Sequence, residues 1–374
     1  MPKTRTPESY RRPLPEDEDV TLRISHPLAC CPKGHTLINR HTVIRYVHDI
    51  PAVATPQITQ HTMEKGYCPT CKKEVTAYPV APAPVTFGPN IQRFVAAAST
   101  VFRLSQPQIQ GMLKIHYNTT VASGEIAKMI ERESVVLHPE RERILSAIQL
   151  SDVKQLDETS WKVCIGDGSE KYCWIMTDAL GPKRIYVPGV NRGKGNCDAL
   201  LGENPRGCTV SDDYGAYHSL PLHQLCFAHV HRDFKDLAQS AHLSAEVKQH
   251  CRELTSELRN ICRAIDLDRN PQKYEHFASR LRALTTPFPN EPAKLSTYKA
   301  TLTKNIPKYL TCLTDARIPL TNNRAERDIR HVVLKRNVSF GSRTPESAKR
   351  TGILLSVLMT RKAEGTLGDY LRGV

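Results

Sequence analysis

Three acidic residues stand at positions where a globular chain ordinarily buries apolar side chains. Asp157 lies inside an expected strand, Asp212 ends another, and Glu326 shares a helical face with Ile329 and Val333. A carboxylate in a central strand is costly to bury unless a cation or hydrogen bonds satisfy it. Three acids that converge from two strands and a helix would hold two divalent cations, which clamp the attacking and leaving oxygens of a phosphodiester.

Each of these acids also has an ordinary structural interpretation. Asp157 or Asp212 taken alone is more simply a salt-bridged or turn residue. Asn323 followed three residues later by Glu326 resembles a capping box, in which the glutamate closes the helix N-terminus. Because side chains alternate along a strand, Asp212 continues the face of the preceding strand, whereas Asp213 is expected to help the chain turn.

A second group of residues has the spacing of metal ligands. Cys31 and His35 precede the Cys-x-x-Cys pair of Cys68 and Cys71, and Cys30 is an alternative first ligand. Four such ligands suit tetrahedral Zn²⁺, which can stabilise a segment with little apolar core. Unrelated surface thiols are the alternative, and a redox pair is disfavoured because no βαβ pattern surrounds the motif.

The charge balance points to a polyanionic partner. The chain carries 52 Lys and Arg against 38 Asp and Glu, a net charge of +14, and its pI is near 9.2. Half of this excess falls in residues 317–374, with twelve basic and five acidic residues. The residues that we expect to neutralise phosphates, rather than form a solvated helix face, are Arg324, Arg327, Arg330, Lys335 and Arg336.

The elements that must position these residues follow an α/β pattern. Residue types common in strands predict strands over 152–165, 171–178, 184–190 and 207–212, with a fifth over 222–230 that leads into a helix. About 80 residues of helical composition follow, from 232 to 316. The last segment predicts a helix from Asn322, an interruption over 338–345 and a second helix over 347–364.

Two short helices are expected before the strands. Ser105 and Ser123 each precede apolar residues at three- and four-residue spacing, so each is a candidate N-cap. The pair is compatible with a helix-turn-helix, and an ordinary helical hairpin fits the pattern equally well.

The chain as a whole reads as a multi-domain α/β protein. We expect a flexible leader (1–24), a zinc-binding module (25–80), a linker (81–90), a helical DNA-binding region (91–150), a catalytic domain in two parts (151–240 and 318–374) and a helical insertion (241–317). No window reaches the roughly 18 uncharged apolar residues of a membrane helix, and no signal peptide is expected at the N-terminus. Seven scattered cysteines indicate a reducing compartment, hence a cytoplasmic protein.

Several of these motifs together resemble insertion-sequence-66-type transposases. The segments that carry the resemblance are Asp157–Thr159, Asp212 with Tyr214 and Tyr217, Cys226–His229 with Arg232 and Phe234, Asn322–Arg327, Lys335–Asn337, Phe340–Ser342, Leu354–Glu364 and Tyr370–Leu371, with Cys31–Pro32, Cys68–Cys71 and Phe87–Asn90 in the N-terminal part. The resemblance implies a DDE transposase with a ribonuclease H-like catalytic domain, a mixed five-stranded sheet with helices. Asp157, Asp212 and Glu326 would then carry Mg²⁺ or Mn²⁺.

The sequence departs from the family pattern at three places. Thr321 stands where the family typically has Asp, and Asp213 replaces a Gly. Gly34 and His35 stand in place of the second Cys of the first knuckle. None of these departures removes one of the three acids.

His229 admits two interpretations. A lone histidine after a strand is commonly a structural residue. In the Cys-x-x-His context of Cys226 and His229, it would instead contact the scissile phosphate or fix the site, and we count it among the catalytic candidates.

The leading prediction is an enzyme that cleaves and joins DNA at the terminal inverted repeats of its own mobile element and in target DNA. Its expected form is a homo-oligomer on DNA, associated with the nucleoid, with accessory proteins of the same element as further partners. A catalytically inert, sequence-specific DNA-binding regulator is the alternative from another class. A nuclease without transfer activity is a third interpretation.

Overall fold

The structure is a computed structural model that describes residues 15–20, 22–25, 42–46, 56–60, 62, 64–76, 87–166, 168 and 171–373. The chain divides into two compact units, Met1–Pro56 and Gln57–Val374. In the first unit, the described residues include a 3-10 turn, η2 (Asp17–Asp19), where the Arg23 guanidinium pairs with Asp17 at 2.9 Å. Within the described ranges, no helix has the length and apolar character needed to span a bilayer.

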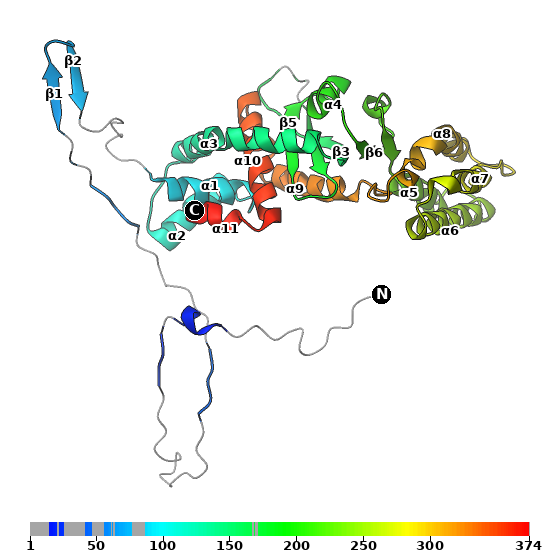
Figure 1. Ribbon diagram of the computed structural model, residues 1–374, viewed down its shortest axis with the longest axis horizontal. Helices are drawn as coiled ribbons and strands as arrows, with labels where there is room; N and C mark the ends of the chain where they lie inside the picture. Colours follow the sequence, from blue (N-terminus) through cyan, green and yellow to red (C-terminus); the bar gives the residue numbers. More distant parts are fainter. Residues whose placement is uncertain are drawn as a thin grey trace, which may run out of the picture. The chain divides into compact units, whose positions relative to one another are not determined.

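The second unit contains a two-stranded hairpin and a five-stranded sheet (Figure 1). The hairpin pairs β1 (Lys65–Cys68) with β2 (Lys73–Thr76) in antiparallel register. The strands of the larger sheet are β3 (Val153–Ser160), β4 (Tyr172–Asp178), β5 (Arg184–Val190), β6 (Cys208–Ser211) and β7 (His223–Leu225). Their order is β5-β4-β3-β6-β7; β3, β4 and β5 are antiparallel, and β6 and β7 run parallel to β3. This mixed five-stranded sheet confirms the α/β class.

Two of the expected strands are shorter than the sequence suggested. The strand expected over 152–165 ends at Ser160, because Val163 leaves the sheet and forms an isolated bridge with Ser342. The strand expected over 222–230 ends at Leu225, because Phe227 already begins a helix. Apolar residues continue past both ends, so composition alone did not mark them.

The helices number eleven within the described residues: α1 (Pro89–Thr100), α2 (Gln106–Tyr117), α3 (Ser123–Gln149), α4 (Lys194–Leu201), α5 (Phe227–Gln239), α6 (Ala245–Leu267), α7 (Tyr274–Leu284), α8 (Ala293–Tyr309), α9 (Asn323–Ser339), α10 (Pro345–Glu364) and α11 (Leu367–Arg372). Short 3-10 turns lie at Gly215–Tyr217, Pro271–Lys273 and Thr311–Leu313. The break between α9 and α10 falls where the sequence predicted an interruption.

The helix caps before the sheet differ in one respect from the prediction. Ser105 caps α2 in a capping box with Gln108, as expected for that helix. The residue before α3, however, is Ala122, and Ser123 is already helical. Ser123 is therefore the first residue of α3 rather than its N-cap, and its hydroxyl donates to the Gln110 side chain at 3.2 Å.

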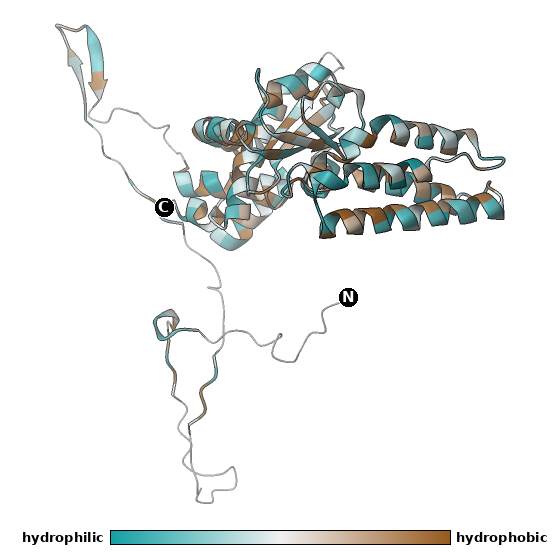
Figure 2. Ribbon diagram, turned by 45° about the vertical axis from the view of Figure 1, so that its right-hand side comes forward, coloured by the Kyte–Doolittle hydropathy of each residue, from teal (hydrophilic) through white to brown (hydrophobic). Residues whose placement is uncertain are grey.

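The sheet has two differently covered faces. Val153, Cys208 and Val210 lie on one face and belong to a core shared with α5 and α6. Leu156 and Trp174 lie on the other face and belong to a core shared with α3, α4 and α10. Figure 2 shows hydrophobic residues concentrated on the strands and hydrophilic residues on the outer sides of the helices. Alternation along β3 therefore decides which side chains meet which helices.

The helices α6, α7 and α8 form an insertion that begins and ends at one place in the fold (Figure 1). The chain leaves the sheet at Cys226 and returns to it at Asn322. Here the Phe227 amide donates to the Leu320 carbonyl at 3.0 Å, and the Asn322 amide donates to the Cys226 sulfur at 3.3 Å. The two ends of the insertion are thus joined by hydrogen bonds at its base.

A buried ion pair fixes α9 against the edge of the sheet. The Arg184 guanidinium on β5 donates to the Asp328 carboxylate on α9 at 3.0 Å, and about a tenth of each side chain is exposed. The Thr177 hydroxyl donates to the same carboxylate oxygen at 3.2 Å. Since Asp328 lies two residues after Glu326, this contact also orients the first turns of α9.

We expect Asp328→Ala to lower the free energy of unfolding by about 3–5 kcal/mol, because it leaves the Arg184 charge buried without its partner. Urea denaturation measures this change. The matched control is Asp369→Ala, which breaks an exposed pair with Arg372 and should cost less than about 1 kcal/mol. Equal small effects in both variants would show that the buried pair does not hold α9.

Candidate active site

Asp157 lies in the middle of β3, opposite Ile175 in the antiparallel register. One carboxylate oxygen accepts a hydrogen bond from the Asn322 side chain at 3.3 Å, and the other accepts from the Glu158 amide at 2.8 Å. Burial raises the pKa of Asp157 to about 8, and the negative charges of Glu158, Asp212 and Glu326 add to the rise. The carboxylates of β3, the end of β6 and α9 therefore act on one another electrostatically.

Gln155, two residues before Asp157 on the same face of β3, holds the start of α9. Its side-chain oxygen accepts hydrogen bonds from the Arg324 and Ala325 amides, each at 3.1 Å. Its side-chain nitrogen donates to the Thr321 carbonyl at 3.1 Å. The strand that carries the first acid thus also positions the helix that carries the third.

Glu326 does not form the capping box that its spacing allowed. The residue before α9 is Asn322, and no side chain caps this helix. The Glu326 carboxylate instead faces α5, 3.9 Å from Nε2 of His229 and 3.6 Å from the Arg232 guanidinium. The backbone amide of Glu326 donates to the Asn322 carbonyl at 3.1 Å. The carboxylate is therefore free of a structural capping role.

Two buried polar atoms beside these acids lack a hydrogen-bond partner within the described part of the chain. They are Nδ1 of His229 and Oδ1 of Asn322. An unsatisfied buried polar atom costs free energy unless a bound group satisfies it. Their presence next to Glu326 and Asp157 indicates that this region is built to meet a further polar group.

Asp212 and Asp213 have different surroundings. Asp212 follows β6 directly, and one of its oxygens accepts from the Tyr214 amide at 3.1 Å. Asp213 lies 3.0 Å from Nε2 of His218 and accepts from the Asn305 side chain of α8 at 3.0 Å. Asp213 therefore connects the turn after β6 to the insertion, whereas within the described ranges no other side chain binds the Asp212 carboxylate.

The donor set of Asp157, Asp212 and Glu326 fits a hard divalent cation, because Mg²⁺ and Mn²⁺ prefer carboxylate oxygens. Burial, and after it the negative charges of Glu158, Asp212 and Glu326, raise the pKa of Asp157. Across the described ranges, however, no three His, Cys, Asp or Glu side chains are already arranged as a metal site.

Glu158 was not singled out from the sequence, although it neighbours Asp157. Because it lies on the opposite face of β3, it points away from Glu326; its side chain is only 2% exposed. It accepts from the Arg192 guanidinium at 2.6 Å and from the Tyr217 hydroxyl. Arg192 also lies over the Tyr214 ring, 3.9 Å from its centroid. These contacts join the turn after β6 to β3.

The five basic residues expected at phosphates fall into two groups. Arg327 and Arg330 are exposed on α9. Arg324 donates to the Ala179 carbonyl at 3.1 Å, and Arg336 donates to the Ser160 carbonyl, so both guanidinium groups hold backbone. Lys335 is only 8% exposed, lies 3.3 Å from the Ser99 hydroxyl, and burial lowers its pKa to about 8. Lys335 is therefore buried where α9 meets α1, and its predicted contact with phosphate stays a prediction.

His331 sits in the same contact between α9 and α1. Its Nε2 lies 3.0 Å from the Thr100 carbonyl and its Nδ1 lies 2.8 Å from the Arg103 guanidinium. This pairing requires the neutral ring with the proton on Nε2. Burial, together with the nearby charge of Arg103, lowers the pKa of His331 to about 4.

We expect His331 to make the fold sensitive to acid. The unfolded chain takes up this proton near pH 6.5 and the folded chain only near pH 4, so stability is complete above about 6.5 and falls toward 4. The loss attributable to His331 is up to about 3 kcal/mol. His331→Gln, which keeps a donor and an acceptor, should lack this part of the loss when urea unfolding is compared at neutral and acidic pH. An unchanged pH dependence would contradict the assignment.

The zinc prediction is only partly covered by the described residues. Cys68 ends β1, Cys71 lies in the turn before β2, and the Cys71 amide donates to the Cys68 sulfur at 3.4 Å. This hydrogen bond, with the Cys71 thiol, lowers the pKa of Cys68. Cys30, Cys31 and His35 lie outside the described residues, so the four-ligand set stays a prediction.

The mixed five-stranded sheet and its helices define an α/β protein. The family model described as Transposase IS66 family matches residues 85–350, a span that runs from before α1 into α10 and contains Asp157, Asp212 and Glu326. The chain belongs to this family, which confirms the resemblance seen in its motifs. Comparison with curated proteins gives no significant match.

Proposed function

We propose that this transposase catalyses metal-dependent strand cleavage and strand transfer of DNA through Asp157, Asp212 and Glu326. The observation that carries the proposal is that Gln155 and Asn322 join β3, which bears Asp157, to the start of α9, which bears Glu326, while Asp212 follows the neighbouring strand β6. Membership of a transposase family supplies the reaction class. The basic balance of the chain, +14, is that of a protein with a polyanionic substrate.

The catalytic domain is proposed to be ribonuclease H-like. Three antiparallel strands followed by two strands parallel to the first support this assignment. The domain would comprise residues 151–240 and 318–374, with 241–317 as a helical insertion. Residues 91–150 would form a helical DNA-binding region, and residues 25–80 a zinc-binding module after a leader (1–24) and before a linker (81–90).

The side chains around the acids have distinct proposed tasks. Asp157, Asp212 and Glu326 would hold Mg²⁺ or Mn²⁺, which when bound activates water or a 3′-hydroxyl and stabilises charge on the phosphate. Gln155 and Asn322 position the acids through the contacts that join β3 to α9. His229, whose Nε2 lies 3.9 Å from the Glu326 carboxylate, would contact the scissile phosphate or fix the site.

The proposed partners are nucleic acid and copies of the same chain. The DNA substrates are the terminal inverted repeats of the element and its target, with the exposed Arg327 and Arg330 contacting phosphates. Assembly as a homo-oligomer on DNA, accessory proteins of the same element and a place in the nucleoid belong to the same proposal.

The deciding experiment incubates purified protein with labelled terminal DNA and Mg²⁺ or Mn²⁺ and resolves the products by size. Nicked ends together with joined strands would establish a transposase reaction. Nicking without joined strands would indicate a nuclease alone. Binding without nicking at either metal would overturn the proposal in favour of an inert DNA-binding regulator.

A further inference from the structure

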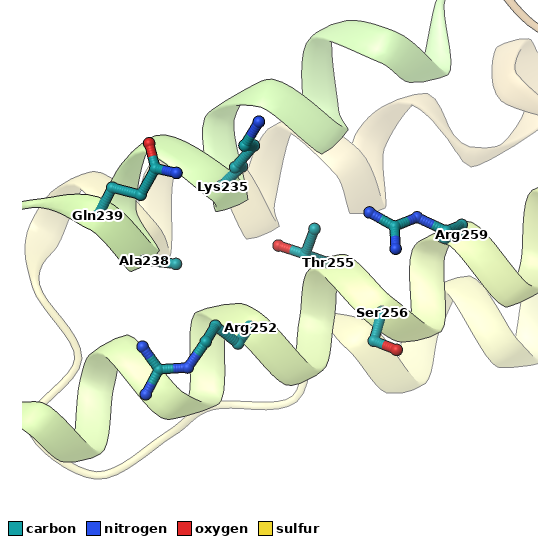
Figure 3. Close-up of a pocket in the computed structure, with 7 residues that line it drawn as sticks. All are labelled: Lys235, Ala238, Gln239, Arg252, Thr255, Ser256 and Arg259. Atoms are coloured by element: carbon teal, nitrogen blue, oxygen red, sulfur yellow. The ribbon is translucent and has the colours of Figure 1, made fainter. Parts of the chain in front are cut away.

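A basic cleft separates α5 from α6 in the helical part of the chain (Figure 3). Its volume is about 300 Å³, and none of the residues that line it belongs to the acid site. The lining residues are Lys235, Ala238 and Gln239 on α5, and Arg252, Thr255, Ser256 and Arg259 on α6. The four residues of α6 recur at intervals of three, one and three positions, which places them on one face of the helix.

The cations of this cleft are not neutralised by the protein. Within the described part of the chain, no carboxylate lies within 4.0 Å of the charged atoms of Lys235, Arg252 or Arg259. Arg252 donates to the neutral Gln249 side chain at 2.9 Å, and Arg259 lies 3.2 Å from Nε2 of His231.

Two other arginines of the same helical region are paired. Arg280 pairs with Glu257 at 2.5 Å, and Arg269 pairs with Asp266 at 2.5 Å. Burial lowers the pKa of His231, and the positive charges of Arg259 and Lys235 lower it further. The cleft is therefore a place where uncompensated positive charge collects.

The exposed side of α5 connects this cleft to the acid site. Arg232 lies 3.6 Å from the Glu326 carboxylate, and Lys235 follows one turn later. His231, directly before Arg232 in sequence, lies 3.2 Å from the Arg259 guanidinium across the cleft. A helix rises about 1.5 Å per residue, so Lys235 is about 9 Å along α5 from His229. That length corresponds to roughly three base pairs at 3.4 Å each.

We infer that the α5–α6 cleft binds the phosphate backbone of duplex DNA beside the position that is cleaved. Lys235, Arg252 and Arg259 contact phosphate oxygens as charged donors, and Ser256 and Gln239 add neutral donors. The inference rests on the proposed function only for the location of the cut. The phosphate contacts themselves depend neither on the DNA sequence nor on the three acids of the candidate active site. The insertion thus extends the DNA path from α9 along α5.

The test compares two triple variants of the full chain with the unaltered protein. The cleft variant is Lys235→Gln, Arg252→Gln, Arg259→Gln. The control, Lys273→Gln, Arg282→Gln, Lys304→Gln, removes the same charge from helical residues that do not line the cleft. Affinity for a duplex of unrelated sequence is measured by fluorescence anisotropy over a series of salt concentrations. Thermal unfolding verifies that both variants are folded.

We expect the salt dependence of DNA affinity to weaken in the cleft variant and to change much less in the control. Each phosphate contact contributes about 0.9 to the slope of log K against log salt, so the cleft variant should lose about 2 to 3 units and the control much less. Equal slopes in the two folded variants would overturn the inference.

Nicking of terminal DNA by the unaltered protein is scored separately. A cleft-specific change of slope without any nicking would retain the binding site and reject the proposed chemistry. Nicking by the unaltered protein, with equal slopes in the two variants, would retain the proposed chemistry and reject the binding site.

Discussion

Asp212→Asn is expected to abolish DNA nicking while the protein remains folded and still binds DNA. A metal ligand must supply negative charge at a fixed position, and the amide of Asn removes the charge with almost no change in shape. Removing one group of a catalytic unit commonly lowers the rate by roughly 10³-fold or more. Asp157→Asn and Glu326→Gln should behave in the same way. The measurement is the rate of strand nicking in Mg²⁺, accompanied by DNA affinity and thermal unfolding.

Asp213 provides the matched control one residue away. Its side chain binds His218 and Asn305, so Asp213→Asn and Asp213→Gly should weaken the turn after β6 but retain substantial nicking. The loss in stability should be on the order of one or two hydrogen bonds, about 1–2 kcal/mol. If Asp213→Asn is inactive and Asp212→Asn is active, the second acid has been assigned one residue too early.

Removal of zinc should have the second large effect, confined to the N-terminal part of the chain. The hairpin β1–β2 has four paired positions, and its apolar residues Tyr67 and Val75 are 63% and 57% exposed. A two-stranded hairpin without an apolar core is marginally stable in water. A structural Zn²⁺ contributes apparent binding energies of about 10–16 kcal/mol at neutral pH, enough to stabilise such a segment.

We therefore expect about one Zn²⁺ per chain by elemental analysis, and nearly none in Cys68→Ser, Cys71→Ser. Chelation should unfold residues 25–80 and leave the melting transition of the sheet domain in place. Cys164→Ser, which changes another exposed cysteine, is the control and should keep the metal. Protein prepared without chelator that contains no zinc would reject the prediction.

The sequence was most informative where periodicity is local. The strand-forming residue types of β3 and β4, the Ser105 N-cap of α2 and the break between α9 and α10 all follow from neighbouring residues. Each depends on contacts within a few positions of the chain, and these can be read from spacing.

The parts that the sequence did not predict depend on contacts between distant segments. Gln155 binds backbone atoms of residues 321–325. A single glutamine within a strand does not predict this role. Lys335 belongs to a series of basic residues, yet packing against α1 buries it. The paired Glu158 and Arg192 are 34 positions apart. The division of the basic residues between structure and surface therefore needed the tertiary arrangement.

The joined base of the helical insertion has a consequence for how the third acid is held. The Phe227 amide donates to the Leu320 carbonyl and the Asn322 amide donates to the Cys226 sulfur, so the two ends of the insertion are held together. These hydrogen bonds offset part of the conformational entropy that is lost when the long loop closes. The position of Glu326 depends on Gln155 rather than on the helices beyond α5. The inferred DNA-contacting arm and the third acid are thus held by separate sets of contacts within one continuous chain.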